Sequence, residues 1–140
     1  MRSPLHGLAG ALAGAGLALA LPALADTPAG LLGVLEQQAR QADPAFLGFS
    51  AASGRELFRQ PHGGEWSCAS CHTDDPAASG RHAKTGKSIE PLAPAVNPQR
   101  FSNAAKVEKW FRRNRNDVLG RVCTAQEKGD VLTWLTTIRK

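Results

Sequence analysis

The sequence predicts an all-α fold of short helices joined by loops, on three observations. Four segments carry helix-capping signals or apolar residues at helical spacing. No segment alternates apolar and polar residues convincingly enough for a strand. Hydrophobic residues make up 42% of the 140 residues and charged residues 21%, which indicates a globular chain rather than a disordered one.

The first two helices are predicted from local signals. Residues 31–41 form the first, which ends before Asp43-Pro44. Residues 51–59 form the second, in which Ser53 and Glu56 have the spacing of a capping box. Both helices precede the segment that carries the chemistry.

Two further helices are predicted in the C-terminal part. Residues 102–113 form the third, with Ser102 as N-cap and an apolar stripe of Val107, Trp110 and Phe111. The last helix begins after Thr124, in the capping box Thr124-Ala125-Gln126-Glu127. Its apolar face consists of Val131, Leu132, Trp134, Leu135 and Ile138.

The first 25 residues have the features of an export signal. Arg2 gives a basic start, and a run of Leu, Ala and Gly over residues 8–21 is short for a membrane span. The sequence Ala23-Leu24-Ala25 has the small-x-small pattern that a signal peptidase recognises, so we expect cleavage after Ala25. Residues 26–140 would then be one domain. An uncleaved membrane anchor is the alternative.

Charge is uneven along this mature chain. Residues 26–99 hold six basic and eight acidic side chains, whereas residues 100–140 hold ten basic and four acidic ones. In an exported protein, a positive region of this kind favours an acidic protein partner or an anionic membrane surface over nucleic acid. A solvated helix face explains the same pattern.

The stretch from Asp74 to Pro98 is predicted as a loop that lacks a core of its own. It is rich in Pro, Gly, Ala and Ser, and it has few side chains to bury. A structureless stretch of this length is uncommon in a small domain. We therefore expect something other than side chains to organise it.

The segment Cys68-Ala69-Ser70-Cys71-His72 is a C-x-x-C-H motif, the attachment signature of c-type haem. The two thiols add to the vinyl groups on one edge of the porphyrin, and the adjacent histidine becomes the proximal iron ligand. A redox C-x-x-C pair would need a βαβ context, and a zinc site would need a second pair of ligands. Neither is evident, so the motif predicts one haem c bound through Cys68 and Cys71, with His72 on the iron.

This arrangement resembles class I cytochromes c over residues 50–140. The resemblance rests on a helix with Gly54 and Phe58, the haem motif, a long loop, a third helix and a last helix with Trp134. It implies a class I cytochrome c-like fold, with short helices and loops wrapped around the covalently attached haem. The first and last helices of that unit are expected to cross near the haem edge.

The second face of the iron lacks the usual methionine, because the single Met of the chain is Met1. The candidate ligands are few: His62, His82, Cys123, Lys106, Lys109, Asn114 and Asn116. Asn114 shares a predicted helix face with Val107, Trp110 and Phe111. This inward-facing stripe would place Asn114 where class I cytochromes c carry the distal ligand. An asparagine at this point also fits a helix C-terminus, where it tolerates a left-handed conformation.

Three further stretches resemble the sphaeroides haem protein (SHP) family of small exported cytochromes c. They are Pro91-Leu92-Ala93-Pro94 with Arg100-Phe101, residues 106–114 and residues 116–121. The resemblance implies that Asn114 binds ferric iron and leaves on reduction, which opens ferrous haem to oxygen, nitric oxide or carbon monoxide. It also implies a dihaem cytochrome c or a membrane cytochrome b as electron donor.

One position departs from that family pattern. Family members often carry a cysteine directly after the ligand asparagine, bonded to a cysteine at the position of Cys123. Arg115 occupies that place here, so Cys123 is unpaired. A buried small side chain is the favoured role of Cys123; an intermolecular disulfide and a reactive thiol are the alternatives.

The chemistry of an amide ligand agrees with a gated site. An amide oxygen is a hard, neutral and weak donor, so it suits ferric iron better than ferrous iron. The sequence therefore predicts a periplasmic monohaem cytochrome c that accepts electrons and binds diatomic ligands. The alternatives are a simple electron carrier with a permanent distal ligand such as His82, and a terminal oxidoreductase, for which no acid–base relay is evident.

Overall fold

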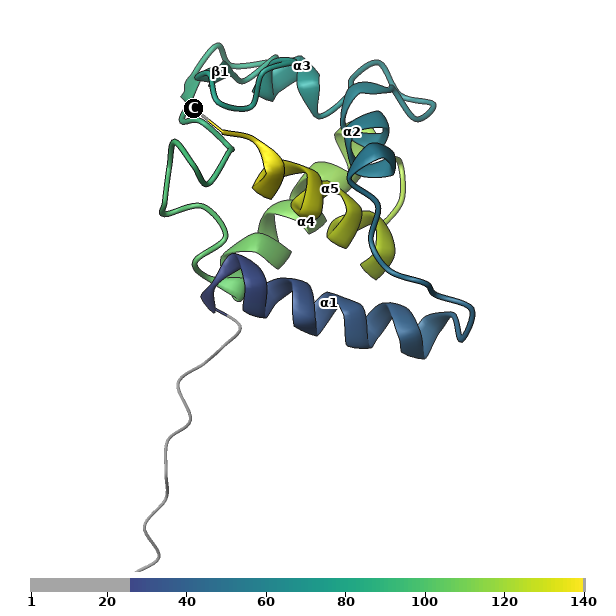
Figure 1. The fold of residues 1–140 in the computed structure, drawn as a ribbon. Coiled ribbons are helices and arrows are strands. Elements are labelled where there is room, and N and C mark those ends of the chain that lie inside the picture. Colours follow the sequence, from purple (N-terminus) through teal and green to yellow (C-terminus); the bar gives the residue numbers. More distant parts are fainter. Residues whose placement is uncertain (1–25, 140) are drawn as a thin grey trace, which may run out of the picture.

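Helix α5 lies at the centre of the fold, between α1 on one side and α2 on the other (Figure 1). The computed structural model describes residues 26–139, so the predicted signal segment, residues 1–25, lies outside the described residues. The described elements follow in the order α1 (Pro28–Ala42), α2 (Ala51–Arg59), α3 (Ala69–His72), β1 (Gly80–Arg81), β2 (Ser88–Ile89), α4 (Ala104–Val118) and α5 (Ala125–Thr137). The predicted all-α class is confirmed. None of the described helices is both long and apolar enough to cross a bilayer.

The caps explain where α1 and α2 begin. Helix α1 starts three residues before the predicted position, because the Thr27 side chain accepts a hydrogen bond from the N–H of Gly30 at 3.0 Å. Helix α2 covers the predicted residues. Its cap is Ser50, whose hydroxyl accepts from the N–H of Ser53 at 3.1 Å, so the predicted capping role of Ser53 is wrong. The Thr124 capping box of α5 is confirmed.

Helix α4 begins later and ends later than predicted. Ser102 is not its cap: the Ser102 hydroxyl donates to the carbonyl of Gln99, whereas the Asn103 side chain accepts from the N–H of Lys106 at 2.7 Å. Asparagine is as good an N-cap as serine. No glycine or proline interrupts residues 104–118, and the helix stops just before Gly120, which has a φ of 63°.

The stretch predicted as a structureless loop contains a hairpin. Strands β1 and β2 pair antiparallel, with Gly80 opposite Ile89. Two loop hydrogen bonds close the turn: His82 N–H to the carbonyl of Lys87, and Gly86 N–H to the carbonyl of His82, each 2.8 Å. Strands of two residues are too short to show an alternating pattern, which is why the sequence did not reveal them.

Helices α2 and α5 cross in direct backbone contact. Gly54 lies so close to the Asp130 carbonyl that a Cβ atom at this position would overlap it. Below the contact, the Phe58 ring packs against Trp134 with ring centroids 5.0 Å apart. The N–H of Ser50, just before α2, donates to the Asp130 carboxylate at 2.7 Å. The sequence expectation that these two helices cross is therefore confirmed.

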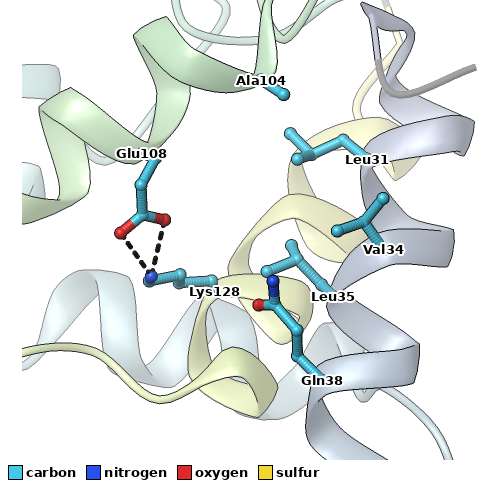
Figure 2. Close-up of a pocket in the computed structure, with 7 residues that line it drawn as sticks. All are labelled: Leu31, Val34, Leu35, Gln38, Ala104, Glu108 and Lys128. Atoms are coloured by element: carbon cyan, nitrogen blue, oxygen red, sulfur yellow. Dashed lines mark hydrogen bonds and ion pairs between the residues drawn. The ribbon is translucent and has the colours of Figure 1, made fainter. Parts of the chain in front are cut away.

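A second cluster fixes α1 and α4 against α5. Leu31 and Leu35 of α1 pack on Leu132 of α5. An adjoining hollow of about 260 Å³ lies between the three helices, and Figure 2 shows the side chains that line it. On one side of it, the buried Lys128 ammonium binds both carboxylate oxygens of Glu108 on α4, at 2.7 and 2.9 Å. This pair holds the first half of α4 on the central helix.

Gly54→Ala is expected to lower the free energy of unfolding by about 1–3 kcal/mol, because its methyl group must push α2 and α5 apart. Gly33→Ala, in the middle of α1, is the matched control, since a Cβ there meets nothing within 4 Å. The free energy of unfolding of Gly33→Ala is expected to rise by about 0.5–1 kcal/mol. Denaturant unfolding of the haem-loaded proteins measures both. An unchanged Gly54→Ala protein would contradict the backbone contact.

Candidate haem-binding site

A single helical turn, α3, brings the three motif side chains together. Cys68, Cys71 and His72 stand at i, i+3 and i+4, so they share one face of the turn. The His72 N–H donates to the Cys68 carbonyl at 3.0 Å. Ser67 and Ser70 lock the start of the turn, because the N–H of each donates to the other's hydroxyl, at 3.0 and 3.2 Å.

The hairpin packs directly on this turn. Gly80 lies against the Cys71 carbonyl so closely that a Cβ atom would overlap the oxygen. Three residues later, the N–H of Ala83 donates to the Cys71 sulfur at 3.3 Å. On the exit side, the Arg59 guanidinium at the end of α2 donates to the Asp74 carbonyl at 3.1 Å. The turn is thus held by the elements before and after it.

The His72 side chain is half-buried beside Phe58, with 6.2 Å between the ring centroids. Burial, together with the positive charge of Arg100, lowers the pKa of His72 to about 4. The imidazole is therefore neutral at pH 7, which is the form that binds a metal. Arg100 itself is held in place by the Pro91 carbonyl, to which its guanidinium donates at 2.9 Å.

None of Cys68, Cys71 and Cys123 is in a disulfide bond. Burial raises the pKa of the Cys68 thiol to about 12, and the neighbouring Cys123 acts in the same direction. Cys123 is 9% exposed, and burial raises its pKa as well. The sequence interpretation of Cys123 as a buried side chain is therefore confirmed.

The donor set of α3 fits a haem c. It offers two unpaired thiols on the same face of a turn as a neutral imidazole. Cys68 also packs against the apolar cluster of Phe58, Val131, Trp134 and Leu135, which suits the edge of an apolar porphyrin. The thiols would carry the covalent bonds, and His72 would be the proximal ligand.

The alternative histidines have local structural roles. The His62 ring donates from Nε2 to the Leu57 carbonyl at 2.8 Å, at the end of α2. The His82 ring accepts at Nδ1 from the N–H groups of Lys84 and Thr85, each at 3.3 Å, and so closes the hairpin turn. Each ring therefore stabilises the loop in which it lies.

The remaining candidates lie on α4. Lys106, Lys109 and Asn114 are exposed, and the side chain of Asn116 lies outside the described part of the chain. Asn114 lies four residues before the end of α4, so the interpretation of Asn114 as a helix cap is wrong. No hydrogen bond or ring contact joins Asn114 to His72 within residues 26–139.

The apolar stripe of α4 is only partly as predicted. Val107 packs against the cluster of Leu31, Leu35 and Leu132. Trp110 does not turn inward: it is 46% exposed, and its ring lies 5.2 Å from the Arg113 guanidinium. A cation–π contact to the next turn of the same helix accounts for this placement.

The sequence did not reveal the ion pair between Lys84 and Asp117, which measures 2.9 Å. It joins the hairpin to the last turn of α4. The role of Gly80 was also missed. Neither feature has a signal in the sequence, because the partners are far apart along the chain and lie in stretches without periodicity.

Comparison with known proteins identifies relatives over most of the chain. Residues 44–135 match a family described as "Domain of unknown function (DUF1924)". The cytochrome c-type protein SHP of Cereibacter sphaeroides is 46% identical over 123 residues, 84% of this chain and 90% of that protein. Cytochrome c'' of Methylophilus methylotrophus is 42% identical over 106 residues, 73% of this chain and 74% of that protein.

Solved structures of both relatives have the same fold. The structure of oxidised SHP, described as an oxygen-binding cytochrome c, has a TM-score of 0.71 at 41% identity and covers 80% of this chain and 97% of its own. The solution structure of cytochrome c'' concerns haem-ligand detachment. It has a TM-score of 0.72 at 36% identity, and the match covers 81% of this chain and 94% of that chain. The chain therefore belongs to the family of c-type cytochromes that contains SHP and cytochrome c'', and haem c is its cofactor.

Proposed function

We propose that this chain is a periplasmic monohaem cytochrome c that accepts electrons and binds diatomic ligands at ferrous haem, with Asn114 as a redox-labile distal ligand. The observation that carries the proposal is the Cys68–His72 turn in a chain that is 46% identical to SHP. A solved structure of SHP bears the description of an oxygen-binding cytochrome c.

The turn supplies the fixed side of the site. Cys68 and Cys71 would attach the haem, and the neutral His72 imidazole would bind the iron. When bound, the haem supplies an iron that changes oxidation state and takes small ligands. Gly80 and Ala83 contact Cys71 from the hairpin side and so hold the turn in place.

Asn114 supplies the variable side. Its side chain is exposed within α4, and its amide is a weak, hard donor that favours the ferric state. No methionine is present after Met1 to take this role. The solution structure of cytochrome c'' is described as giving insight into haem-ligand detachment, and this supports a distal ligand that leaves the iron.

The proposed location and partners follow from sequence and kinship. The Ala23-Leu24-Ala25 pattern predicts export and cleavage after Ala25. A dihaem cytochrome c or a membrane cytochrome b is the proposed electron donor. A simple electron carrier with His82 as permanent ligand is the second candidate, but the His82 ring already closes the hairpin turn.

Asn114→Ala is expected to convert the ferric haem from low spin to high spin, because the sixth ligand is lost. The rate of carbon monoxide binding to the ferrous protein is expected to stay as in wild type, since Asn114 has already left. Absorption spectra and flash photolysis measure the two effects. Asn116→Ala, two residues along, is the control and should leave the ferric spectrum unchanged.

Two results would count against the proposal. A ferric Asn114→Ala spectrum identical to wild type would remove Asn114 as the ligand. A wild-type ferrous spectrum with sharp low-spin bands and no response to carbon monoxide would favour the electron carrier. Turnover of oxygen with a chemical electron donor would instead reveal an enzyme.

Gly80→Ala is expected to reduce the fraction of purified chain that carries covalent haem, because its methyl group displaces β1 from the Cys71 carbonyl. Ser88→Ala, at an exposed position on the paired strand, is the control and should load normally. The ratio of haem absorbance to protein mass measures loading. Equal loading of the two variants would show that the turn does not need the hairpin.

A further inference from the structure

Two ion pairs hold helix α4, one on each side of Asn114. The first joins the buried ammonium of Lys128 to the half-exposed carboxylate of Glu108, six residues before Asn114. The second is the Lys84–Asp117 pair, three residues after it. The segment that carries Asn114 therefore lies between an anchor on α5 and an anchor on the hairpin.

The second anchor connects α4 to the haem-attachment segment from both sides of the C-x-x-C-H motif. Lys84 directly follows Ala83, whose N–H binds the Cys71 sulfur. The Lys84 ammonium also lies 4.7 Å from the centroid of the Trp66 ring, two residues before Cys68. The Lys84 ammonium, in a loop after the motif, thus contacts both Trp66, which precedes the motif, and Asp117 of α4.

The backbone supports the same junction. A Cβ atom at Gly64 would lie 3.4 Å from the Asp117 carbonyl oxygen and 3.5 Å from that of Val118, so Gly64, two residues before Trp66, lies beside the last turn of α4. Val118 is buried there. A positive ammonium near the C-terminal end of a helix also interacts favourably with the helix dipole. Charge and packing therefore place Lys84 at this point.

We infer that Lys84, Asp117 and Trp66 form a clasp that fixes the end of α4 against the haem-attachment segment and sets how firmly Asn114 binds ferric iron. This inference rests on the proposed function of Asn114. The Lys84 and Asp117 side chains are 55% and 48% exposed. An ion pair this exposed shifts an equilibrium by only about two- to fivefold. A contact of that strength restrains a ligand without preventing its release.

The test uses the full haem-loaded protein and compares Lys84→Gln with Lys87→Gln. Both variants remove one positive charge from the same hairpin. Lys84→Gln is expected to raise the ratio of high-spin to low-spin ferric haem, and the rate of azide binding to it, by about two- to fivefold. Lys87→Gln is expected to match wild type. The carbon monoxide rate of the ferrous protein should not change in either variant, because Asn114 is then off the iron.

Two further measurements distinguish the clasp from a general effect on stability. Lys84→Arg keeps the charge and the contact with Trp66, so it should restore the wild-type ratio. In 1 M salt, where the Debye length is about 3 Å, the difference between Lys84→Gln and wild type should shrink. Asp117→Asn should reproduce Lys84→Gln, and the double variant should add nothing to either single change.

The outcomes separate the clasp from the proposed function. If Lys84→Gln and Asp117→Asn both match Lys87→Gln while Asn114→Ala turns high-spin, the clasp is wrong and the ligand assignment stands. If Asn114→Ala has the wild-type ferric spectrum, the proposed function fails first. A change in the ferrous carbon monoxide rate with Lys84→Gln would also overturn the clasp, since it would place the effect on the haem pocket as a whole.

Discussion

The contact between Gly54 on α2 and the Asp130 backbone on α5 is the constraint on which the rest of this fold depends. Because the two backbones touch, the ring of Phe58 one turn later lies against Trp134, and the end of α2 has a fixed position. The chain then runs from α2 into α3 within nine residues. The position of the turn with the two cysteines and His72 thus depends on the crossing of α2 and α5, although that crossing contains none of the haem-binding residues.

The two sides of the candidate site are built on different physical principles. The proposed proximal side is held by close contacts of the backbone of Gly80 and Ala83 with Cys71. The proposed distal side is helix α4, which packs through Val107 and is also held by two ion pairs, one with a buried ammonium and one exposed. Backbone contacts leave little freedom, whereas exposed ion pairs break and re-form easily. In the proposed function, the rigid support would hold the permanent ligand His72, and the yielding support would hold the releasable ligand Asn114.

The sequence predicted the features that depend on neighbouring residues. The Thr124 capping box, the limits of α2 and the C-x-x-C-H segment are all local, and the structure has them. The sequence analysis failed for Trp110, which turns outward to Arg113 on the same helix, and for the hairpin, which forms in a stretch without periodicity. Asn114 was proposed as the ligand because the chain lacks methionine after Met1, because it shares a helix face with Val107, and because of the family resemblance; this assignment stays a prediction. Lys84 and Asp117, 33 residues apart, left no pattern to read.

The burial of Cys123 bears on how a haem protein of this kind resists oxidation of its own side chains. Iron and oxygen together generate oxidants that convert methionine to sulfoxide and cysteine to sulfenic acid. The chain after residue 25 has no methionine and no tyrosine to be damaged. Once Cys68 and Cys71 are in thioether bonds, Cys123 is the last oxidisable thiol of the described chain, and burial keeps it protonated and shielded. Within the described residues, the chain would thus offer almost no reactive sulfur to such oxidants.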